Sequence, residues 1–200
     1  MKLGPKYKIA RRLGAPIFEK TQNPKYVLSL ARKEKSAKRQ RPRSEFGLSL
    51  LEKQKARFTY GLTEGQFKNY VDKALRSSNP TQKLFSLLER RLDNVLYRAG
   101  FAKSRAQARQ TASHGHTLVN EKRVTVPSIF LKIGDKVSVR TGSAKSPLFL
   151  EAKERMKNLL VPVWIELDPE KPEAKVVGDP VYDGATEHFN LGVVVEFYNR

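Results

Sequence analysis

The residues best suited to chemistry in this chain are arginines that recur between residues 88 and 140. Arg91 and Arg98 are seven positions apart in one amphipathic stretch, and Arg105 and Arg109 are four apart in the next. At 100° per residue, the members of each pair share one face of a helix. Guanidinium groups held on a fixed face bind phosphate oxygens through paired N–H donors. The spacing therefore predicts a surface that recognises a nucleic-acid backbone.

Two helices must hold these arginines. The first is predicted as one continuous helix, because apolar residues recur every three or four positions at Leu84, Leu88, Leu92, Val95 and Ala99. This helix is expected to end at Gly100. Arg90 lies off the apolar stripe and is expected to point to solvent. Ser104 followed by Gln107 is the pattern of a capping box, and it predicts the start of the second helix. The N–H groups at such a helix start favour phosphate oxygens.

The remaining elements are short. Strands are predicted at 117–119, 124–126, 136–139, 164–167 and 175–177, with a turn at Gly134-Asp135. Helices are predicted over 25–39 and 46–61, and Thr63 with Gln66 forms a second capping box before another helix. Residues 191–198 contain three successive valines, and propensity alone favours a strand there.

Charge is distributed unevenly along the 200 residues, which carry a formal net charge of +19. Residues 1–60 hold 17 Lys/Arg against 4 Asp/Glu and residues 61–140 hold 15 against 6, whereas residues 141–200 hold 7 against 10. The basic part predicts a polyanionic partner, and nucleic acid is the commonest one. A membrane surface is the competing polyanion, but we expect no membrane association, because no apolar run approaches the roughly 20 residues of a spanning helix. The polar N-terminus also lacks the apolar core of a signal peptide, so we expect a soluble, cytoplasmic protein.

The run from Leu88 to Gln110, continued by His114-Gly115-His116 and by residues 119–124, closely resembles bacterial small-subunit ribosomal protein four. The central module alone recurs in several RNA-binding proteins, so the matching segments outside it matter. They occur in the family's order at Gly4-Pro5-Lys6 with Arg11-Arg12, at residues 51–55, at Val161-Pro162 with residues 164–170, and at residues 195–198. The resemblance covers nearly the whole chain.

This resemblance implies an α+β protein. A basic N-terminal arm (residues 1–45) and a helical first domain (46–83, completed by 180–200) are expected to precede a second domain (84–179). In that second domain, helices pack on a small, mainly antiparallel sheet and include the RNA-binding module of residues 88–140. The family also implies that residues 191–198 form a helix, against their strand propensity.

The resemblance further implies a structural protein that binds the 5′ domain of 16S-type rRNA in the small subunit and nucleates its assembly. Other implied partners are mRNA where it enters the subunit, ribosomal protein five and further small-subunit proteins, with an effect on translational accuracy. The residues expected to contact RNA are Arg11, Arg12, Lys38, Arg39, Arg41, Arg43, Lys53, Lys55, Arg57, Arg91, Arg98, Lys103, Ser104, Arg105, Arg109, His114, His116, Asn120, Lys122 and Arg123. The stretch from Lys38 to Arg43 is the part expected to reach mRNA.

The N-terminal arm departs from the usual family pattern. Many relatives bind zinc or an iron-sulfur cluster there through four cysteines, but this chain has no cysteine, and the first paired positions are Tyr7 and Ala10. We therefore expect neither metal nor cofactor. The arm must then be held together by packing of its apolar side chains, namely Tyr7, Ile9, Leu13, Ile17, Phe18, Tyr26 and Leu30.

Two alternative functions compete with a ribosomal one. A free-standing RNA chaperone or translational regulator would use the same basic surface. A pseudouridine synthase is suggested by Arg91-Leu92-Asp93, but only about 60 residues follow the module, too few for that family's separate catalytic domain. Asp93 is expected to be a solvated helix residue or a local ion-pair partner, and we expect no enzymatic activity. Four aromatic residues are expected in the core rather than against bases, namely Phe67, Tyr70, Phe85 and Phe101.

Overall fold

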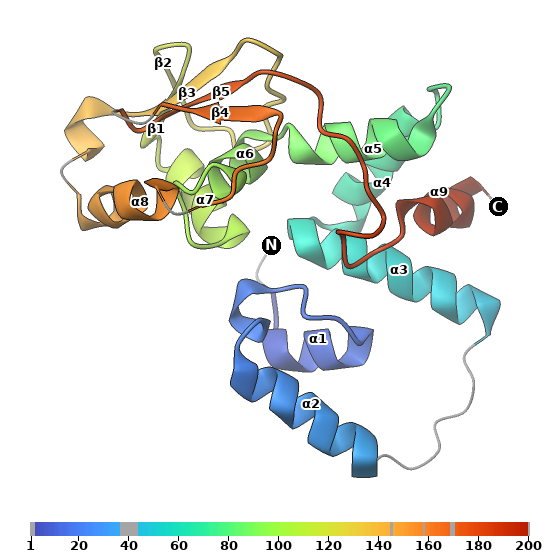
Figure 1. The fold of residues 1–200 in the computed structure, drawn as a ribbon. Helices are drawn as coiled ribbons and strands as arrows, with labels where there is room; N and C mark the ends of the chain where they lie inside the picture. The colour runs from blue at the N-terminus through green and yellow to red at the C-terminus, as the bar shows by residue number, and fades with distance from the viewer. Residues whose placement is uncertain (1–2, 37–43, 145, 158, 169–170, 200) are drawn as a thin grey trace. The chain divides into compact units, whose positions relative to one another are not determined.

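The computed structural model describes residues 3–36, 44–144, 146–157, 159–168 and 171–199 (Figure 1). Contacts divide the chain into a first unit, residues 1–84 with 183–200, and a second unit, residues 85–182. Helices and one antiparallel sheet confirm the predicted α+β class. Along the described residues, no helix is long and apolar enough to cross a membrane.

Described residues of the first unit form helices and no strand. These are α1 (Lys6–Leu13), the short 3-10 helix η1 (Glu19–Thr21), α2 (Pro24–Ser36), α3 (Glu45–Tyr60), α4 (Glu64–Ala74), the start of α5 (Pro80–Glu89) and α9 (Leu191–Asn199). Gly61 ends α3 in the left-handed conformation, with a φ of 61°. The capping box of Thr63 and Gln66 at the start of α4 is confirmed, because each side chain accepts a hydrogen bond from the other's backbone N–H.

The N-terminal arm has a small apolar core of its own. Leu13, Ile17, Phe18 and Tyr26 are buried as predicted, and Ile9 and Leu30 pack against them. Tyr7 instead remains 37% exposed, and its ring lies 5.5 Å from that of Tyr26. Ala10 is completely buried in this core. The residues at the family's first cysteine positions therefore serve packing, and their side chains do not fit a metal site.

Helix α9 resolves the conflict over residues 191–198 in favour of the family. Asn190 Oδ1 accepts hydrogen bonds from the N–H groups of Gly192 (2.9 Å) and Val193 (3.3 Å), which fixes the helix start. Leu191 and Val194, three positions apart, are buried, and α9 packs against α3. Tertiary packing thus overrides the strand propensity of the valines.

The second unit holds a five-stranded antiparallel sheet in the order β2-β1-β3-β5-β4, with α6, α7 and α8 on one face (Figure 1). The strands are β1 (Thr117–Val119), β2 (Lys122–Val124), β3 (Lys136–Val139), β4 (Ile165–Leu167) and β5 (Glu173–Val176). The helices are the remainder of α5, α6 (Leu92–Arg98), α7 (Arg105–Ser113), the short 3-10 helix η2 (Thr141–Ser143) and α8 (Pro147–Lys157). Val137 and Val139 alternate into the core beneath the sheet and face Val119 and Thr117 across the ladder.

Four predicted strands match β1, β3, β4 and β5, with shifts of one or two residues in the last two. The bounds predicted for the strand at 124–126 are wrong, because the residues that pair with β1 are Lys122–Val124, and Val126 is half exposed. Asn120 and Glu121 both have positive φ, 48° and 66°, and close a two-residue hairpin between β1 and β2. Such a tight turn brings the second strand into pairing immediately after it.

Candidate nucleic-acid interface

The predicted continuous helix before Gly100 is interrupted at residues 90 and 91. Arg91 is extended, with φ −69° and ψ 141°, and pairs with Phe130 in an isolated antiparallel bridge. The N–H of Leu92 donates to the carbonyl of Ile129 (2.9 Å), so this segment uses backbone partners from a distant part of the chain. The apolar stripe is buried as expected, but it is shared between α5 and α6.

Arg90 does not point to solvent as predicted. It is buried, its Nε donates to the carbonyl of Leu131 (2.8 Å), and its guanidinium group pairs with Asp179. The guanidinium also lies 4.4 Å from the ring centroid of Phe130. Arg90 therefore ties the helix break to the segment at 130–131 and to the C-terminal end of the second unit.

Two buried carboxylates organise the arginines around this break. The Glu89 side chain is 1% exposed and accepts hydrogen bonds from Arg98 Nε (2.8 Å) and Nη2 (3.0 Å). Arg105 Nη2 lies 3.9 Å from the same carboxylate. Arg105 is further fixed by Asn94, whose Oδ1 accepts from its Nε at 2.7 Å, and by the ring of Tyr97, 4.5 Å away.

Asp93, 3% exposed, plays the same part for the other two arginines. Its Oδ1 accepts from Arg91 Nε (3.0 Å), and its Oδ2 accepts from Arg91 Nη2 (2.8 Å) and from Arg109 Nε (2.9 Å). The ion-pair alternative for Asp93 is therefore confirmed, and the solvated one is wrong. Because both oxygens are engaged by guanidinium groups, this carboxylate is not placed to act on a substrate.

Four guanidinium groups thus share two carboxylates, which leaves the group with a formal charge of +2. Arg91 is itself buried, whereas the side chains of Arg98 and Arg109 are each 25% exposed and that of Arg105 is 13% exposed. The exposed edges belong to groups whose positions are already fixed, so little side-chain entropy is lost when they bind an anion. We call Arg98, Arg105 and Arg109 with Glu89 and Asp93 the arginine cluster.

The start of α7 is partly as predicted. Ser104 Oγ accepts a hydrogen bond from the N–H of Gln107 (3.3 Å). Gln107 Oε1 accepts a hydrogen bond from the N–H of Lys103 (2.7 Å), whereas a capping box would require the N–H of Ser104. The exposed Lys103 ammonium pairs with Glu151 on α8. The helix is therefore capped, and Lys103 and Ser104 lie immediately before its first turn, next to Arg105 of the arginine cluster.

The hairpin β1–β2 projects two exposed cations, Lys122 and Arg123. Asn120 fixes the hairpin, because its side chain accepts from the N–H of Lys136 (2.9 Å) and donates to Asp135 (2.8 Å). This places the predicted residue Asn120 in a structural contact with β3. The guanidinium group of Arg123 lies against the backbone of Gly115 and donates to the carbonyl of His114 (3.4 Å).

Both predicted histidines lie beside this hairpin. Their ring centroids are 5.9 Å apart, with His114 exposed and His116 half-buried. The Nδ1 of His116 is 2.9 Å from Ser143 Oγ, and its ring meets Phe149 edge-on. The exposed Arg140, which was not among the predicted RNA contacts, donates its backbone N–H to the carbonyl of His116 (2.9 Å) and adds a further cation here.

Gly115 allows a test of the position of Arg123. A Cβ at Gly115 would lie 2.4 Å from Arg123 Nε, so Gly115→Ala is expected to displace this guanidinium group. Gly115 has a φ of 69° and Gly134 a φ of 95°, so alanine at either site is strained by about 1 kcal/mol. Of the two substitutions, only Gly115→Ala places a Cβ against Arg123, because a Cβ at Gly134 has no atom within 4 Å.

Urea denaturation of the two variants is expected to show similar losses of stability. RNA titration is expected to show about tenfold weaker binding for Gly115→Ala alone, as for one lost charge-assisted contact. Equal affinities of Gly115→Ala and Gly134→Ala would show that Arg123 does not bind RNA from this position.

The predicted cations of the first unit divide into exposed and structural ones. Arg11 and Arg12 are exposed on α1. Lys53 is buried and pairs with Glu64 at 2.6 Å while its ammonium lies over the rings of Phe197 and Tyr198. Two further cations are engaged locally, Lys55 with Glu52 and Arg57 with Gln54. Four others, Lys38, Arg39, Arg41 and Arg43, lie outside the described residues.

Glu64 makes the attachment of α9 dependent on pH. Burial alone would raise the pKa of this carboxyl, but hydrogen bonds from Lys53 and from the Tyr198 hydroxyl (2.7 Å) outweigh it and hold the pKa below its ordinary value of 4.5. A carboxyl whose pKa is lowered by folding contributes stability above its ordinary pKa and loses it as the pH falls through the lowered one. Burial, together with Glu64, raises the pKa of Tyr198, so the corresponding loss at high pH begins above 10.

Glu64→Gln is therefore expected to be less stable than the unsubstituted chain at pH 7, with the difference shrinking as the pH falls towards 3. Urea denaturation followed by far-UV circular dichroism measures this difference. Asp72→Asn, which removes an exposed carboxylate from the same helix, is the control and should show no comparable gap at pH 7. A gap for Glu64→Gln that stays constant with pH would contradict the assignment.

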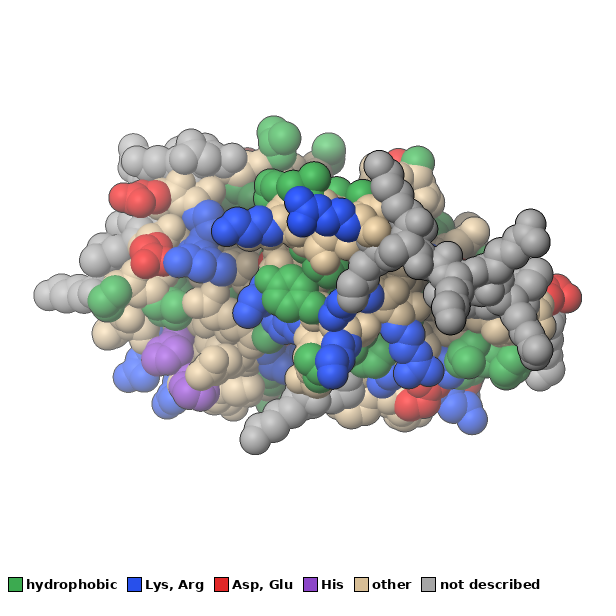
Figure 2. Space-filling model, turned by 90° about the horizontal axis from the view of Figure 1, so that it is seen from below, with side chains coloured by type: hydrophobic (Ala, Val, Ile, Leu, Met, Phe, Trp, Pro, Cys, Tyr) green, Lys and Arg blue, Asp and Glu red, His purple; other side chains and the backbone are tan. Residues whose placement is uncertain are grey.

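Lysine and arginine side chains are spread over the face seen in Figure 2, where aspartate and glutamate are few. Among the described residues, no group of three or more His, Asp or Glu side chains could hold a metal ion. The organising role of Glu89 was not predicted from the sequence. Its signal is the four-residue spacing from Asp93, which placed two acidic residues beside an otherwise apolar stripe.

Comparison with known proteins gives a consistent result over the whole chain. The family described as "Ribosomal protein S4/S9 N-terminal domain" matches residues 2–89, and the S4 domain matches residues 90–137. Three similar proteins are each named small ribosomal subunit protein uS4. The one from Roseiflexus sp. (strain RS-1) is 42% identical over 98% of both chains. That from Aquifex aeolicus (strain VF5) is 40% identical over 99% of this chain and 98% of the relative, and that from Streptococcus thermophilus (strain CNRZ 1066) is 43% identical over 98% and 97%.

Proposed function

The chain belongs to the family of small ribosomal subunit protein uS4, and on that premise we propose that it is a structural protein of the small ribosomal subunit that binds 16S-type rRNA. Its place in the cell is then the cytoplasm, within that subunit. The RNA it binds is the 5′ domain, and binding there nucleates assembly. The observation that carries the proposal is the arginine cluster, in which buried carboxylates fix guanidinium groups whose edges remain exposed.

Phosphate and shape recognition suit this arrangement better than base reading. Arg98, Arg105 and Arg109 come from α6 and α7, and Lys122 and Arg123 from the neighbouring hairpin, so the cations are distributed over several short elements. A folded RNA displays its backbone at junctions, where such a distribution can meet several phosphates at once. The free energy of binding then depends strongly on salt, because each neutralised phosphate releases counterions.

A non-catalytic role is part of the proposal. The Asp93 carboxylate, which a pseudouridine synthase would need for catalysis, is 3% exposed and held by Arg91 and Arg109. A buried carboxylate between two guanidinium groups holds those groups in position, and it is not accessible to a uridine. The chain therefore contributes structure to the particle and positions RNA.

Further contacts follow from the family. Residues 38–43 reach mRNA where it enters the subunit, although they lie outside the described residues. Ribosomal protein five and other small-subunit proteins are the protein neighbours, and through them the chain affects the accuracy of translation. The acidic excess of residues 141–200 suits a basic protein neighbour better than it suits RNA.

Sedimentation of a cell extract separates this proposal from a free-standing RNA chaperone or translational regulator. A ribosomal protein is expected to migrate with small subunits after a high-salt wash, because cooperative assembly retains it when exposed ion pairs are screened. A chain found only in the soluble fraction would contradict the proposal and favour the regulator.

A further inference from the structure

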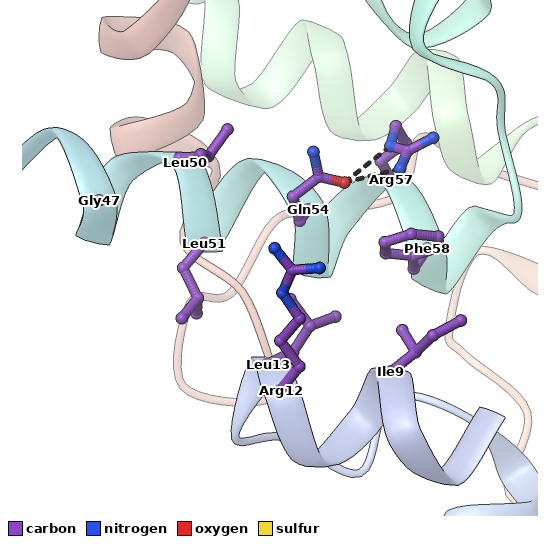
Figure 3. Close-up of a pocket in the computed structure, with 9 residues that line it drawn as sticks. All are labelled: Ile9, Arg12, Leu13, Gly47, Leu50, Leu51, Gln54, Arg57 and Phe58. Atoms are coloured by element: carbon purple, nitrogen blue, oxygen red, sulfur yellow. Dashed lines mark hydrogen bonds between the residues drawn. The ribbon is translucent and has the colours of Figure 1, made fainter. Parts of the chain in front are cut away.

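A cavity of about 470 Å³ lies between α1 and α3 of the first unit (Figure 3). Its size falls in the range of about 300 to 1,000 Å³ found for small-molecule sites. One part of the wall is apolar and includes Leu13, Leu51 and Phe58. Arg12 from α1 and Arg57 from α3 supply cationic groups. Arg57 Nε also lies 3.4 Å from Glu64 Oε2, a carboxylate outside the lining. The lining therefore combines an apolar floor with positive charge.

Arg57 is held in one orientation at this wall. Gln54 Oε1 accepts from its Nε (3.0 Å) and its Nη2 (2.7 Å), and the carbonyl of Leu62 accepts from its Nη1 (3.3 Å). The guanidinium group also lies over the ring of Phe58, with its central carbon 4.3 Å from the ring centroid. In Figure 3, Arg12 extends from α1 towards Gln54, and the side chains of Leu51 and Phe58 face the space between the helices. The polar and apolar parts of the wall are thus fixed side by side.

We propose that this cavity receives a single unpaired nucleotide of the ribosomal RNA, with its base against the apolar floor and its phosphate beside Arg12. The inference rests on the proposed function, since it names a part of the RNA that the chain would bind. A nucleotide combines a base, whose flat face can stack on apolar side chains, with a phosphate, which is an anion that arginine can bind. RNA junctions turn such bases out of the helix, where proteins stack them on aromatic and guanidinium planes.

Filling the cavity provides the first test. Leu50 lines it and is only half-buried, so Leu50→Trp is expected to occupy the space without opening the core of the arm. Leu48 lies two residues away on the same helix, is exposed and does not line the cavity, so Leu48→Trp is the matched control. The full chain is titrated with a transcript of the 5′ domain of 16S rRNA. Leu50→Trp should bind about tenfold more weakly, as expected for loss of one stacked base, and Leu48→Trp should bind normally.

A second pair of variants separates a local contact from general charge. Arg11 and Arg12 are adjacent and exposed on α1, but only Arg12 lines the cavity. General attraction to RNA would weaken equally in Arg11→Gln and Arg12→Gln. A bound nucleotide predicts a larger loss for Arg12→Gln. It also predicts that one unpaired base, protected from base-reactive reagents by the unsubstituted chain, becomes reactive with Arg12→Gln and Leu50→Trp while the rest of the footprint persists.

The outcomes distinguish the two proposals. If the unsubstituted chain does not bind the transcript, the proposed function fails. If it binds, but each variant behaves as its control does and the footprint stays unchanged, the nucleotide site is overturned and the rRNA function stands. Crosslinks in assembled subunits from residue 50 to a neighbouring protein, with none to RNA, would likewise overturn the site.

Discussion

Asp93→Ala is expected to destabilise the second unit by about 3 to 5 kcal/mol, the range for removing one partner from a buried ion pair. The substitution leaves the guanidinium group of Arg91, which is 5% exposed, without its carboxylate, and it releases Arg109 from α6. The large effect comes from the desolvation of a cation that has lost its counter-charge. The free energy of the pair itself is smaller.

Trp164 is the only tryptophan of the chain and lies in the core of the second unit, so its fluorescence during urea denaturation reports on that unit. Glu166→Ala removes an exposed carboxylate from β4 and serves as the control, with an expected change within about 0.5 kcal/mol. If Asp93→Ala and Glu166→Ala unfold at the same urea concentration, the buried carboxylate does not hold the cluster together.

Reversing both hairpin charges, with Lys122→Glu and Arg123→Glu together, is expected to weaken binding to the 5′ domain of 16S rRNA by about 100-fold, as two charge-assisted phosphate contacts are lost. Both side chains are exposed, so the fold should be retained. The slope of log affinity against log salt concentration should fall by about 1.4 to 1.8, because each phosphate contact contributes roughly 0.7 to 0.9.

The matched control carries the same change of charge elsewhere in the second unit. Lys171→Glu with Lys175→Glu alters two exposed lysines in the acidic last third of the chain. This variant should lose much less affinity and keep the salt slope of the unsubstituted chain. Equal losses in both double variants would mean that total charge governs binding and that the hairpin is not a contact surface.

Features encoded within a few residues could be predicted from the sequence. The capping box at Thr63, the end of α3 at Gly61 and the strand at 136–139 were predicted from neighbours in the chain. Phe67, Phe85 and Phe101 lie on apolar patterns and are buried as expected, while Tyr70 is half-buried. Helix α8 was not predicted, although Phe149, Ala152 and Met156 carry the helical spacing that could have revealed it.

Features that depend on distant partners could not be predicted in this way. The break at Arg91 requires Phe130, which pairs with it from 39 residues further along the chain. When that partner is not known, the apolar stripe through Leu88 and Leu92 predicts one continuous helix. The side chains of Arg90 and Arg91 are then predicted to point in directions that the structure does not show. The strand propensity of α9 is likewise overridden by packing against α3. In the candidate interface, the arginines could be named from their spacing and Asp93 could be named as a local ion-pair partner, but the pairing of Glu89 with Arg98 and Arg105 was not predicted.

RNA crosslinking in assembled small subunits, with the crosslinked peptides identified by mass spectrometry, shows directly whether the arginine cluster and the hairpin contact 16S rRNA. Crosslinks to 16S rRNA are expected to concentrate on α7 and the β1–β2 hairpin, around Arg105, Arg109 and Arg123. Crosslinks confined to the acidic part of the chain after residue 160, with none between residues 88 and 140, would contradict it.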